Sequence, residues 1–309
     1  EAILIGRIEN LRFQLKIGYK TLFQPKVQSL TIVHDGILGN TDYDNCVLLL
    51  SELTNLLKGG DTDIIYFNGL RMDSEMYNAA KTHPHYLSRD HYTMPNVHWI
   101  LSLPATYDEF LNSLSKNTRK NIRKYTNRLN KTFGNSLEIK CYANIDDIYK
   151  IINDIELVAK STYKRGMGVG FINNEGTFRI YKLALEKRWM RAYVMYIDGH
   201  PVAYRLGFKY QDTFFGKGTG YDPAYREYRF GTILLIKEIE DFYKSEKINF
   251  IDFGFGDAEY KQIFCNYNYL EGSVYIFSKT MKGLSLNLIK TLNVIASKWI
   301  ESILNRLGI

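Results

Sequence analysis

Cysteine is scarce in this sequence, with three residues among 309. Cys46, Cys141 and Cys265 are odd in number, lie far apart along the chain and form no CxxC pair. A disulfide framework or a cysteine-based zinc site is therefore not expected, and a reducing compartment suits the chain.

Long apolar runs and nucleotide-binding glycine motifs are also missing. No apolar segment reaches the roughly 18 residues that a membrane-spanning helix needs, and the chain opens at Glu1 without a signal-peptide pattern. We therefore expect a cytoplasmic protein, with peripheral contact at the membrane as a further option. The absence of GxGxxG argues against a dinucleotide-binding fold. His83, His85 and His91 have no neighbouring carboxylate cluster, so no metal site is predicted.

What the chain does have is the composition of a globular protein. Hydrophobic residues make up 45% and charged residues 24%, and the length suits one large domain or two of about 150 residues. The formal net charge is +7, and the excess is concentrated in one place. Between Lys116 and Lys131 there are seven basic residues and no acidic one. Such a cluster predicts an anionic partner, which is a phosphate-bearing cofactor, a nucleic acid or a membrane surface.

The two halves of the chain carry the same order of predicted elements. Each half shows two strands, a glycine-bearing turn, a helix, a short strand and a short capped helix. The segments are 11–21, 28–33, 34–40, 43–58, 63–67 and 73–81 in the first half, and 201–210, 213–221, 226–232, 233–244, 249–253 and 256–264 in the second. We interpret this order as a duplicated α/β unit, the alternative being chance, because strand–helix–strand order is common.

A long basic helix is expected to join the two halves. Thr106 to Glu109 reads TYDE, which is a capping box, and apolar residues follow it at near-helical spacing. The second half begins after this helix, and the chain ends in an amphipathic segment. The predicted domains are a first lobe at 1–104, the basic helix at 105–132, a second lobe at 133–280 and a C-terminal helix at 281–309.

Three stretches of the second half resemble the GNAT acetyltransferases. They are SLSKNTRKNIRKYTNRL (113–129), YREYRFGTILLIKEI (225–239) and DFGFGDAEYKQIF (252–264). In detail they are similar to the cellulose-biosynthesis (CelD/BcsL-like) branch, and the layout is similar to the two-lobed Fem-type aminoacyltransferases. The resemblance implies an α/β fold in which the sheet is mixed, as in α+β proteins, and which contains two tandem GNAT-like lobes. The first lobe is expected to be degenerate, because Tyr77 there is followed by Asn78 and its turn contains no arginine.

The turn from Arg226 to Thr232 is the candidate cofactor site. A turn that opens a helix presents unpaired backbone N–H groups and roughly half a positive charge, which suits an anion. Gly231 would let the backbone approach a pyrophosphate, Arg226 and Arg229 would add charge, and Phe230 and Thr232 complete the turn. By the resemblance, this turn holds the pyrophosphate of acetyl-CoA or another acyl-CoA. The alternative is an ordinary surface turn with solvated arginines.

Asp252, Tyr260 and Lys261 are the candidate catalytic residues. Asp252 lies in a short strand that should be buried, where a carboxylate is costly unless it is paired or catalytic. The resemblance implies that Tyr260 meets the leaving thiolate and that Lys261 stabilises the oxyanion. Proton transfer from a phenol of pKa ~10 to the thiolate of a thiol of pKa ~8.5 is energetically uphill. Tyr260 is therefore expected to donate a hydrogen bond to the thiolate instead of acting as a full acid. The alternatives are a packed tyrosine and a solvated lysine.

Two basic segments are candidates for binding the acceptor. Several charges of the basic helix fall broadly on one side of it. The glycine-rich loop YKRGMGVGF borders the acceptor site in the resemblance. A solvated surface is the alternative for both segments. The predicted substrate-binding residues are Arg119, Lys120, Arg123, Tyr163, Lys164 and Arg165.

These observations predict an acyl-CoA-dependent N- or O-acyltransferase. The acceptor, an anionic sugar, lipid or cell-envelope precursor, would attack the thioester directly, because the sequence offers no Ser-His-Asp set and no nucleophilic cysteine context. One alternative is a Fem-like transferase that uses aminoacyl-tRNA, and another is a non-catalytic GNAT-like scaffold in polysaccharide biosynthesis. The segment from Leu284 to Leu307 is expected to form a helix that packs on a lobe, forms a dimer or lies on a membrane surface. The oligomeric state stays open.

Overall fold

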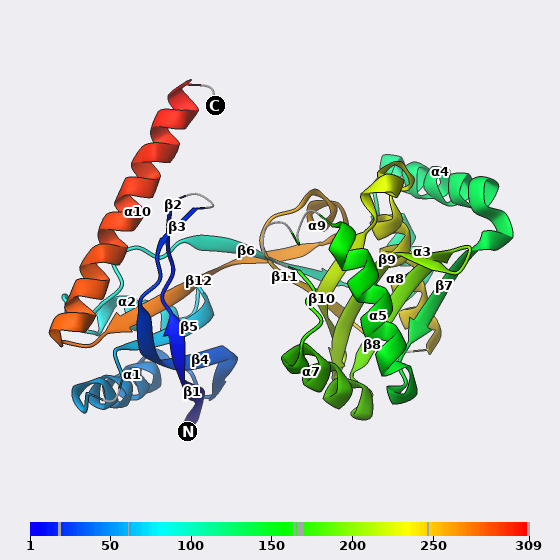
Figure 1. Ribbon diagram of the computed structural model, residues 1–309. Coiled ribbons are helices and arrows are strands. Elements are labelled where there is room, and N and C mark those ends of the chain that lie inside the picture. Colours follow the sequence, from blue (N-terminus) through cyan, green and yellow to red (C-terminus); the bar gives the residue numbers. More distant parts are fainter. Residues whose placement is uncertain (18–19, 61, 163–164, 166–169, 246, 308–309) are drawn as a thin grey trace. The chain divides into compact units, whose positions relative to one another are not determined.

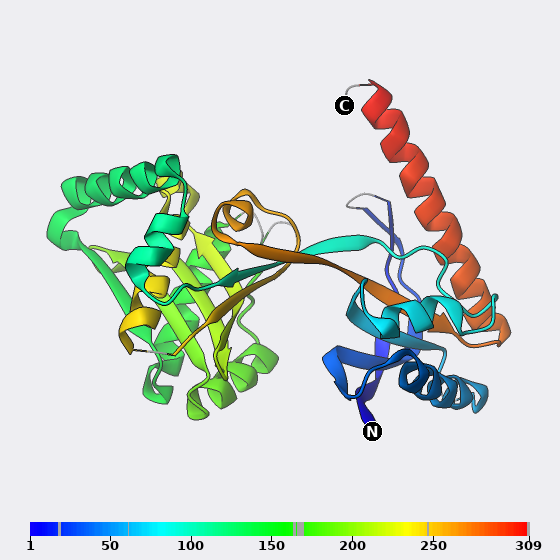
Figure 2. The ribbon, with the colours of Figure 1, turned by 180° about the vertical axis from the view of Figure 1, so that it is seen from behind.

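The computed structural model describes residues 1–17, 20–60, 62–162, 165, 170–245 and 247–307. The chain forms two compact units (Figure 1; Figure 2). Unit 1 consists of Glu1–Val97 and Tyr269–Ile309, and unit 2 consists of His98–Asn268. This division differs from the domain boundaries that the sequence suggested, since residues 269–280 lie in unit 1 together with the C-terminal helix.

Unit 1 contains four strands in the order β1-β4-β5-β12 and a separate two-stranded sheet, β2-β3. Strands β4 and β5 are parallel, while β1 with β4 and β5 with β12 are antiparallel. A parallel neighbour requires a crossover, and helix α1 supplies it. The strands are β1 (Ala2–Arg12), β2 (Leu15–Ile17), β3 (Lys20–Phe23), β4 (Lys26–Gly39), β5 (Ile64–Arg71) and β12 (Tyr267–Phe277).

Helices α1 (Tyr43–Lys58) and α2 (Glu75–Thr82) cover the core of unit 1. Asp42 starts α1, because its carboxylate accepts a hydrogen bond from the backbone N–H of Asn45 at 2.9 Å. The helix then buries Leu50, with Cys46, Leu53 and Leu57 on the same face. The predicted helix at 43–58 is therefore confirmed.

Three local predictions in unit 1 are wrong. The single strand expected at 11–21 is interrupted, because β1 ends at Arg12 and β2 begins at Leu15. The glycine turn expected at 34–40 is strand instead, because β4 runs on to Gly39 and pairs there with β1. The capped helix expected at 73–81 begins two residues later, at Glu75, because its cap is Ser74, whose hydroxyl accepts from the Tyr77 N–H at 3.2 Å. The Asp73 carboxylate is bound by the guanidinium of Arg71, at 2.8 and 3.0 Å.

The C-terminal helix α10 (Met281–Leu307) packs on unit 1 through its first part. Leu286 is buried there, and the Lys290 ammonium donates to the Asp90 carboxylate at 2.5 Å. Further along, Leu292 and Trp299 are exposed. Within the residues described, no helix combines the length and the apolar character needed to cross a bilayer.

Unit 2 contains six strands in the order β6-β11-β10-β9-β8-β7. Strands β10 and β11 are parallel, and the neighbours for which pairing is described elsewhere in this sheet are antiparallel. The strands are β6 (Pro95–Ser102), β7 (Leu137–Tyr142), β8 (Met190–Ile197), β9 (His200–Tyr210), β10 (Thr213–Tyr221) and β11 (Phe250–Phe255).

Helices cover both faces of the unit 2 sheet, as the alternation of side chains along β8 demands. Met190, Ala192 and Val194 belong to the core against α5 and α7, whereas Tyr193 and Met195 belong to the core against α4 and α8. The helices are α3 (Tyr107–Ser113), α4 (Lys116–Phe133), α5 (Ile148–Ser161), α7 (Glu175–Glu186), α8 (Phe230–Ser245) and α9 (Glu259–Phe264).

The predicted connecting helix is two helices, α3 and α4. The capping box at Thr106 and Glu109 is present and starts α3. The backbone turns extended at Leu114 and Ser115, and the Ser115 hydroxyl then caps α4 by accepting from the Thr118 N–H at 3.1 Å. Ser115 favours this break because a serine hydroxyl satisfies the free N–H groups of a new helix start.

Candidate active site

The parallel strands β10 and β11 pair for a short distance and then separate. Pairing covers three residue pairs, the last of which is Phe215 with Asp252. Immediately afterwards the register of β10 against β9 shifts between Gly216 and Gly218. A hollow of about 150 Å³ opens at this point, and it is lined by Arg205, Gly216, Lys217, Gly218, Thr219, Phe253, Tyr260 and Lys261.

Lys261, one of the predicted catalytic residues, is buried at the edge of this hollow. Its ammonium donates to the carbonyl oxygens of Gly254, Phe255 and Gly256 at 3.0, 2.9 and 3.0 Å. An ammonium group has three N–H donors, so these carbonyls occupy its donors. Gly254 and Gly256 have φ of +68° and +90°, which glycine adopts without strain and which turns the carbonyls inward.

Asp252, the second predicted catalytic residue, supports the same loop from the other side. Its carboxylate lies 2.8 Å from Nε2 of His98 on β6 and accepts from the Gly254 N–H at 2.6 Å. The side chain of His98 is 4% exposed and that of Asp252 is 14% exposed, so the pair is largely shielded from solvent. The cost of placing a carboxylate in this strand is therefore met by pairing. Sequence reasoning did not identify His98.

Tyr260, the third predicted catalytic residue, lines the hollow, and its ring packs edge-on against Phe253 with centroids 5.8 Å apart. Burial raises the pKa of the Tyr260 hydroxyl, and the nearby Arg205 guanidinium opposes that rise. A phenol with a raised pKa stays protonated near neutral pH, so it can donate a hydrogen bond but is a poor proton source. The short helix expected at 256–264 begins only at Glu259, with Ala258 at its cap, and the Asp257 carboxylate accepts from the Gln262 side-chain amide.

A buried ion pair forms the floor of the hollow. Arg205 on β9 donates from Nε to Glu238 on α8 at 2.7 Å, and the two side chains are 6% and 0% exposed. Burial raises the pKa of the Glu238 carboxyl, and the Arg205 charge opposes the rise. Sequence reasoning missed both residues. The one available signal was the single charged residue, Arg205, inside the otherwise apolar segment AYRLGF, whereas Glu238 lies among other charged residues in LIKEIED.

The predicted cofactor turn is held by aromatic packing. Phe230 is fully buried, and its ring stacks on Tyr225 and Tyr228 with centroids 5.4 and 5.9 Å apart. Phe230 can therefore serve a ligand only through its backbone. Arg229 has φ of +56°, an unfavourable backbone conformation for a residue that is not glycine. This residue ends one helical turn, Pro223–Tyr228, and allows α8 to begin at Phe230 in a new direction.

The start of α8 is open to solvent where the sequence placed a pyrophosphate. A Cβ atom built on Gly231 meets no heavy atom within 4 Å. Arg226 and Arg229 are exposed, and neither has an acidic partner in the part of the chain that the structure describes. An uncovered helix start beside two arginines is a suitable anion site, because its first N–H groups have no partner within the helix.

The basic helix α4 borders a separate groove of about 1020 Å³. Lys120 and Arg123 line it and are exposed, whereas the Arg119 guanidinium donates to the Asn112 carbonyl at 2.9 Å, at the end of α3. The groove also has an apolar floor, formed by Ile122, Leu129, Leu137, Ile139, Ile233 and Ile236. Part of the predicted basic surface therefore lines a groove instead of being a flat solvated face.

The glycine-rich segment contributes one described residue to the candidate site. Tyr163 and Lys164 lie outside the described residues. Arg165 donates to the Glu156 carboxylate at 2.7 Å and to the Phe171 carbonyl at 3.0 Å. These contacts give Arg165 a role in holding the end of α5 to the segment that follows it.

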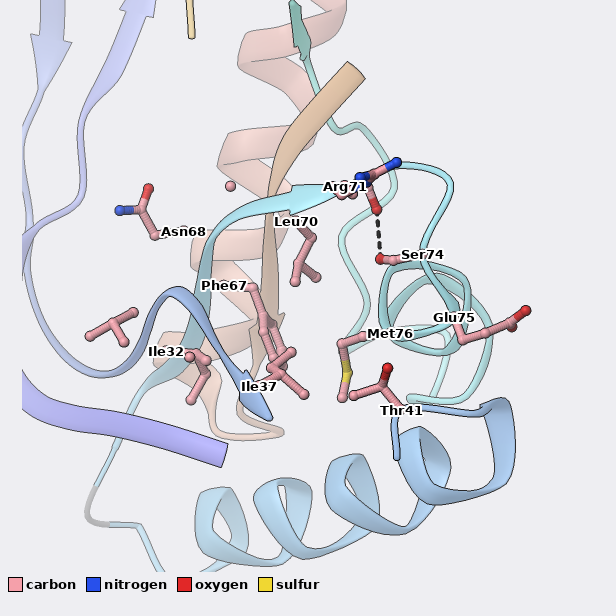
Figure 3. Close-up of a pocket in the computed structure, with 13 residues that line it drawn as sticks. Ile32, Ile37, Thr41, Phe67, Asn68, Leu70, Arg71, Ser74, Glu75 and Met76 are labelled. Atoms are coloured by element: carbon pink, nitrogen blue, oxygen red, sulfur yellow. Dashed lines mark hydrogen bonds between the residues drawn. The ribbon is translucent and has the colours of Figure 1, made fainter. Parts of the chain in front are cut away.

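Unit 1 contains a hollow at the equivalent place, shown in Figure 3. Strands β4 and β5 pair in parallel up to Ile32 and Phe67 and then separate, as β10 and β11 do. The side chains around this space are mostly apolar, including Ile37 and Met76. Among the described residues that line it, Arg71 is the one basic side chain, and Asp73 binds it. The first lobe thus keeps the strand geometry without the cationic lining of the second.

Comparison with known proteins agrees with this geometry. Residues 116–262 match the model of the acetyltransferase (GNAT) domain family. A search of curated protein sequences finds no match to the chain. The matched segment contains the basic helix, the cofactor turn and the hollow between β10 and β11.

Solved structures resemble the chain over both units. FemX superposes with a TM-score of 0.53 at 9% identity, covering 89% of this chain and 88% of that chain. L-PGS from Bacillus licheniformis gives 0.53 at 13% identity, covering 86% of each chain. The C-terminal domain of a putative lysylphosphatidylglycerol synthetase from Agrobacterium fabrum gives 0.55 at 8% identity, covering 93% and 88%.

These findings identify the fold and the class of activity. Residues 116–262, within unit 2, match the GNAT domain, and the prediction of an α/β fold with two tandem GNAT-like lobes is confirmed. The protein is an acyltransferase of the GNAT type. Assignment to the cellulose-biosynthesis branch stays a prediction.

Proposed function

We propose that unit 2 transfers an acyl group from a CoA thioester to an amine or hydroxyl of an anionic small molecule. The observation that carries this proposal is the hollow that opens where β10 and β11 separate, lined by Arg205, Lys217, Tyr260 and Lys261. Backbone groups freed by the separation and these polar side chains surround one small space. Such an arrangement can hold a reacting carbonyl group and bring two substrates together.

The donor would bind with its pyrophosphate at the start of α8. The open backbone at Gly231 and the exposed charges of Arg226 and Arg229 support this placement. Thr232 lies in the same first turn, but its N–H already donates to the Arg229 carbonyl at 2.9 Å. The N–H groups of Phe230 and Gly231 are therefore the backbone donors best suited to an anion.

The transfer would be direct, without an acyl-enzyme. Cys265 is the cysteine nearest the hollow in sequence, and burial raises the pKa of its thiol to about 12. A thiol with that pKa is almost wholly protonated near neutral pH, and the thiolate is the nucleophilic form. Tyr260 would donate a hydrogen bond to the departing thiolate, and Asp252 and Lys261 would keep the loop at Gly254–Gly256 in place.

The acceptor would be an anionic sugar, lipid or cell-envelope precursor. The exposed charges of Lys120 and Arg123, which line the groove beside α4, support an anionic acceptor. The apolar floor of that groove suits a molecule that has an uncharged portion as well. Membrane-surface contact through α10, whose Leu292, Trp299 and Ile303 are exposed, is part of the same proposal.

A second candidate donor is aminoacyl-tRNA. Its support is the whole-chain likeness to FemX, at a TM-score of 0.53, together with a cofactor turn that has a single glycine. Basic residues of α4 would then contact nucleic acid instead of a small acceptor. A non-catalytic scaffold is disfavoured by the acyltransferase class of the fold.

Thermal-shift measurements with CoA, acetyl-CoA, longer acyl-CoAs and nucleotide sugars test the proposal. A ligand that binds only the folded state raises the melting temperature. At a ligand concentration of 100 times Kd, the free energy of unfolding increases by about 2.7 kcal/mol. We expect a shift with CoA compounds. No shift with any of them, together with transfer activity that RNase abolishes, would favour the aminoacyl-tRNA donor.

A further inference from the structure

The buried pair of Arg205 and Glu238 lies under the reacting space without an evident structural need. Glu238 is 0% exposed and projects from α8 towards the sheet, and Arg205 is 5% exposed in the middle of β9. One carboxylate oxygen, Oε1 of Glu238, has no hydrogen-bond partner among the described residues. Buried ion pairs are often replaceable by apolar residues without loss of stability, so stability alone does not account for this pair.

The guanidinium of Arg205 faces the hollow. Arg205 is one of the residues that line it, and a Cβ built on Gly216 would lie 3.9 Å from its Nη2. Its Cζ lies over the Phe253 ring, 5.4 Å from the ring centroid, and its charge acts on Tyr260. Nε is held by Glu238, and a side-chain hydrogen bond joins the guanidinium to Tyr260, which also lines the hollow. A guanidinium has five N–H donors, so these two contacts leave further donors at the edge of the hollow.

Lys261, the cation expected to stabilise the oxyanion, is occupied. Its three donors are directed at the carbonyls of Gly254, Phe255 and Gly256. A donor has to be free and aimed in advance at the position where charge develops in order to stabilise it. Among the buried cations that line the hollow, Arg205 meets this requirement better than Lys261.

We infer that Arg205 binds the carbonyl oxygen of the acyl group and stabilises the negative charge that develops on it, with Glu238 as the residue that positions Arg205. This inference rests on the proposed function and names a further catalytic residue for it. The planar guanidinium suits the role because it offers several N–H donors in a fixed geometry and remains charged. Fixing Nε to Glu238 removes the freedom that a long side chain would otherwise lose on binding.

The reaction step balances as follows for an amine acceptor. The nitrogen lone pair attacks the carbonyl carbon, and the C=O π electrons move to oxygen, where Arg205 donates hydrogen bonds. The tetrahedral intermediate then re-forms C=O and breaks the C–S bond, with the bonding electrons leaving on sulfur. The nitrogen loses one proton and the thiolate gains one, giving an amide and free CoA thiol.

The test compares Arg205→Met, Glu238→Leu and the double variant with the wild-type protein. Each single change leaves one buried group without its partner and is expected to reduce stability. The double variant removes both charges at similar volume, so it is expected to regain the melting temperature. A control pair on α7, Glu175→Leu with Arg179→Met, removes an exposed ion pair whose side chains are 77% and 75% exposed.

The decisive measurements use [1-¹³C]acetyl-CoA and CoA. In the wild-type protein the infrared carbonyl stretch of bound acetyl-CoA should lie below its position in water, and in the double variant it should move back up. Calorimetry should show about a fivefold weaker Kd for acetyl-CoA and an unchanged Kd for CoA, as expected when one hydrogen-bonded contact to the acyl group is lost. The α7 control should match the wild type.

Three outcomes overturn the inference in distinguishable ways. A folded double variant that binds CoA and leaves the carbonyl stretch unchanged excludes Arg205 as the carbonyl ligand, while the proposed function stands. A wild-type protein that binds neither CoA nor acetyl-CoA removes the proposed donor, and the inference fails with it. An activity that the double variant regains along with its stability would assign the pair a structural role.

Discussion

At the scale of single residues, the sequence identified Lys261 as a candidate functional residue but did not predict what its ammonium group contacts. The motif around it suggested a charge for the oxyanion, yet the ammonium lies among three carbonyls of the loop Gly254–Gly256. Two glycines with positive φ make that arrangement possible, and Asp252 holds the same loop through the Gly254 N–H. The residue thus shapes one wall of the hollow.

We expect Lys261→Met to lower stability by about 3 kcal/mol, because it removes several hydrogen bonds that involve a charged donor. Chemical denaturation of the variant, with Lys187→Met as a control at an exposed position, measures this. Equal midpoints for Lys261→Met and wild type would restore the original reading of Lys261 as a residue of the chemical step alone.

Tyr260→Phe should act on the chemical step and leave folding nearly unchanged. Removing one donor of this kind costs on the order of 10²–10³ in kcat. Because burial raises the pKa of Tyr260, its hydroxyl keeps its proton well above neutral pH, and the wild-type rate should not fall between pH 7 and 9 through its ionisation. The check is a pH–rate profile of both proteins with the acceptor that screening identifies. A wild-type rate that declines in this range, with no such decline in the variant, would show that Tyr260 ionises there.

At the scale of elements, the start of α8 combines an open backbone with an anchored turn. The rings of Tyr225, Tyr228 and Phe230 fix the turn, while Gly231 leaves space above the helix end. Binding and stability can therefore be separated at position 231, because neither depends on a side chain there.

Gly231→Ala and Gly231→Asp should both weaken CoA binding without loss of stability. Alanine is a better helix former than glycine by up to about 1 kcal/mol, and aspartate is favourable at a helix start. The methyl group would obstruct the approach of the pyrophosphate, and the carboxylate would also repel it, so the Kd should rise more for aspartate. Calorimetry and melting temperatures check this. Unchanged affinity in both variants would exclude the start of α8 as the donor site.

Helix α4 offers a comparison between charges that line the groove and one that does not. Lys120 and Arg123 line it, whereas Lys124 is exposed outside its lining. The double reversal Lys120→Glu with Arg123→Glu should raise the KM of an anionic acceptor several-fold, with a larger effect at low salt, because exposed charges are screened within about 10 Å at 0.1 M. The Kd of CoA should stay the same.

The matched control for this experiment is Lys124→Glu, which reverses a charge on the same helix. If it raises the acceptor's KM as much per charge as the groove variants do, the effect comes from the overall field of α4. The groove would then lose its role as the acceptor site.

At the scale of the whole molecule, the two lobes share a strand arrangement and differ in chemistry. Both contain a parallel pair that separates beside a hollow of about 150 Å³. In unit 1 the lining is mostly apolar, and in unit 2 it includes Arg205, Lys217 and Lys261. Unit 2 therefore contains the candidate site, whereas unit 1 has the same strand arrangement without the buried cationic side chains.

We expect CoA to slow hydrogen exchange in unit 2 alone. Protection should rise in β10 after Gly216, at the start of α8 and around Tyr260, because bound ligand suppresses local opening at the site it contacts. Peptides from β4, β5 and α2 of unit 1 should exchange as they do without ligand. Equal protection around the hollow of unit 1 would contradict the conclusion that the first lobe is degenerate.

The sequence by itself determined the features that depend on short stretches of chain. The capping box at Thr106, the helix at 43–58 and the repeated order of strands and helices follow from local periodicity and from caps a few residues apart. The basic cluster of α4 and the motif that contains Tyr260 were visible for the same reason. Where local signals competed, as at the turn expected at 34–40, pairing with the distant strand β1 decided the outcome.

Only the tertiary structure decided which side chains meet. Arg205 and Glu238 are 33 residues apart, and His98 and Asp252 are 154 apart, so strand order and register bring them together. The direction of Lys261 depends on a loop whose carbonyls turn inward through two left-handed glycines. Such contacts depend on which strands become neighbours and on which face each side chain points to, and a one-residue change in register would reverse the face.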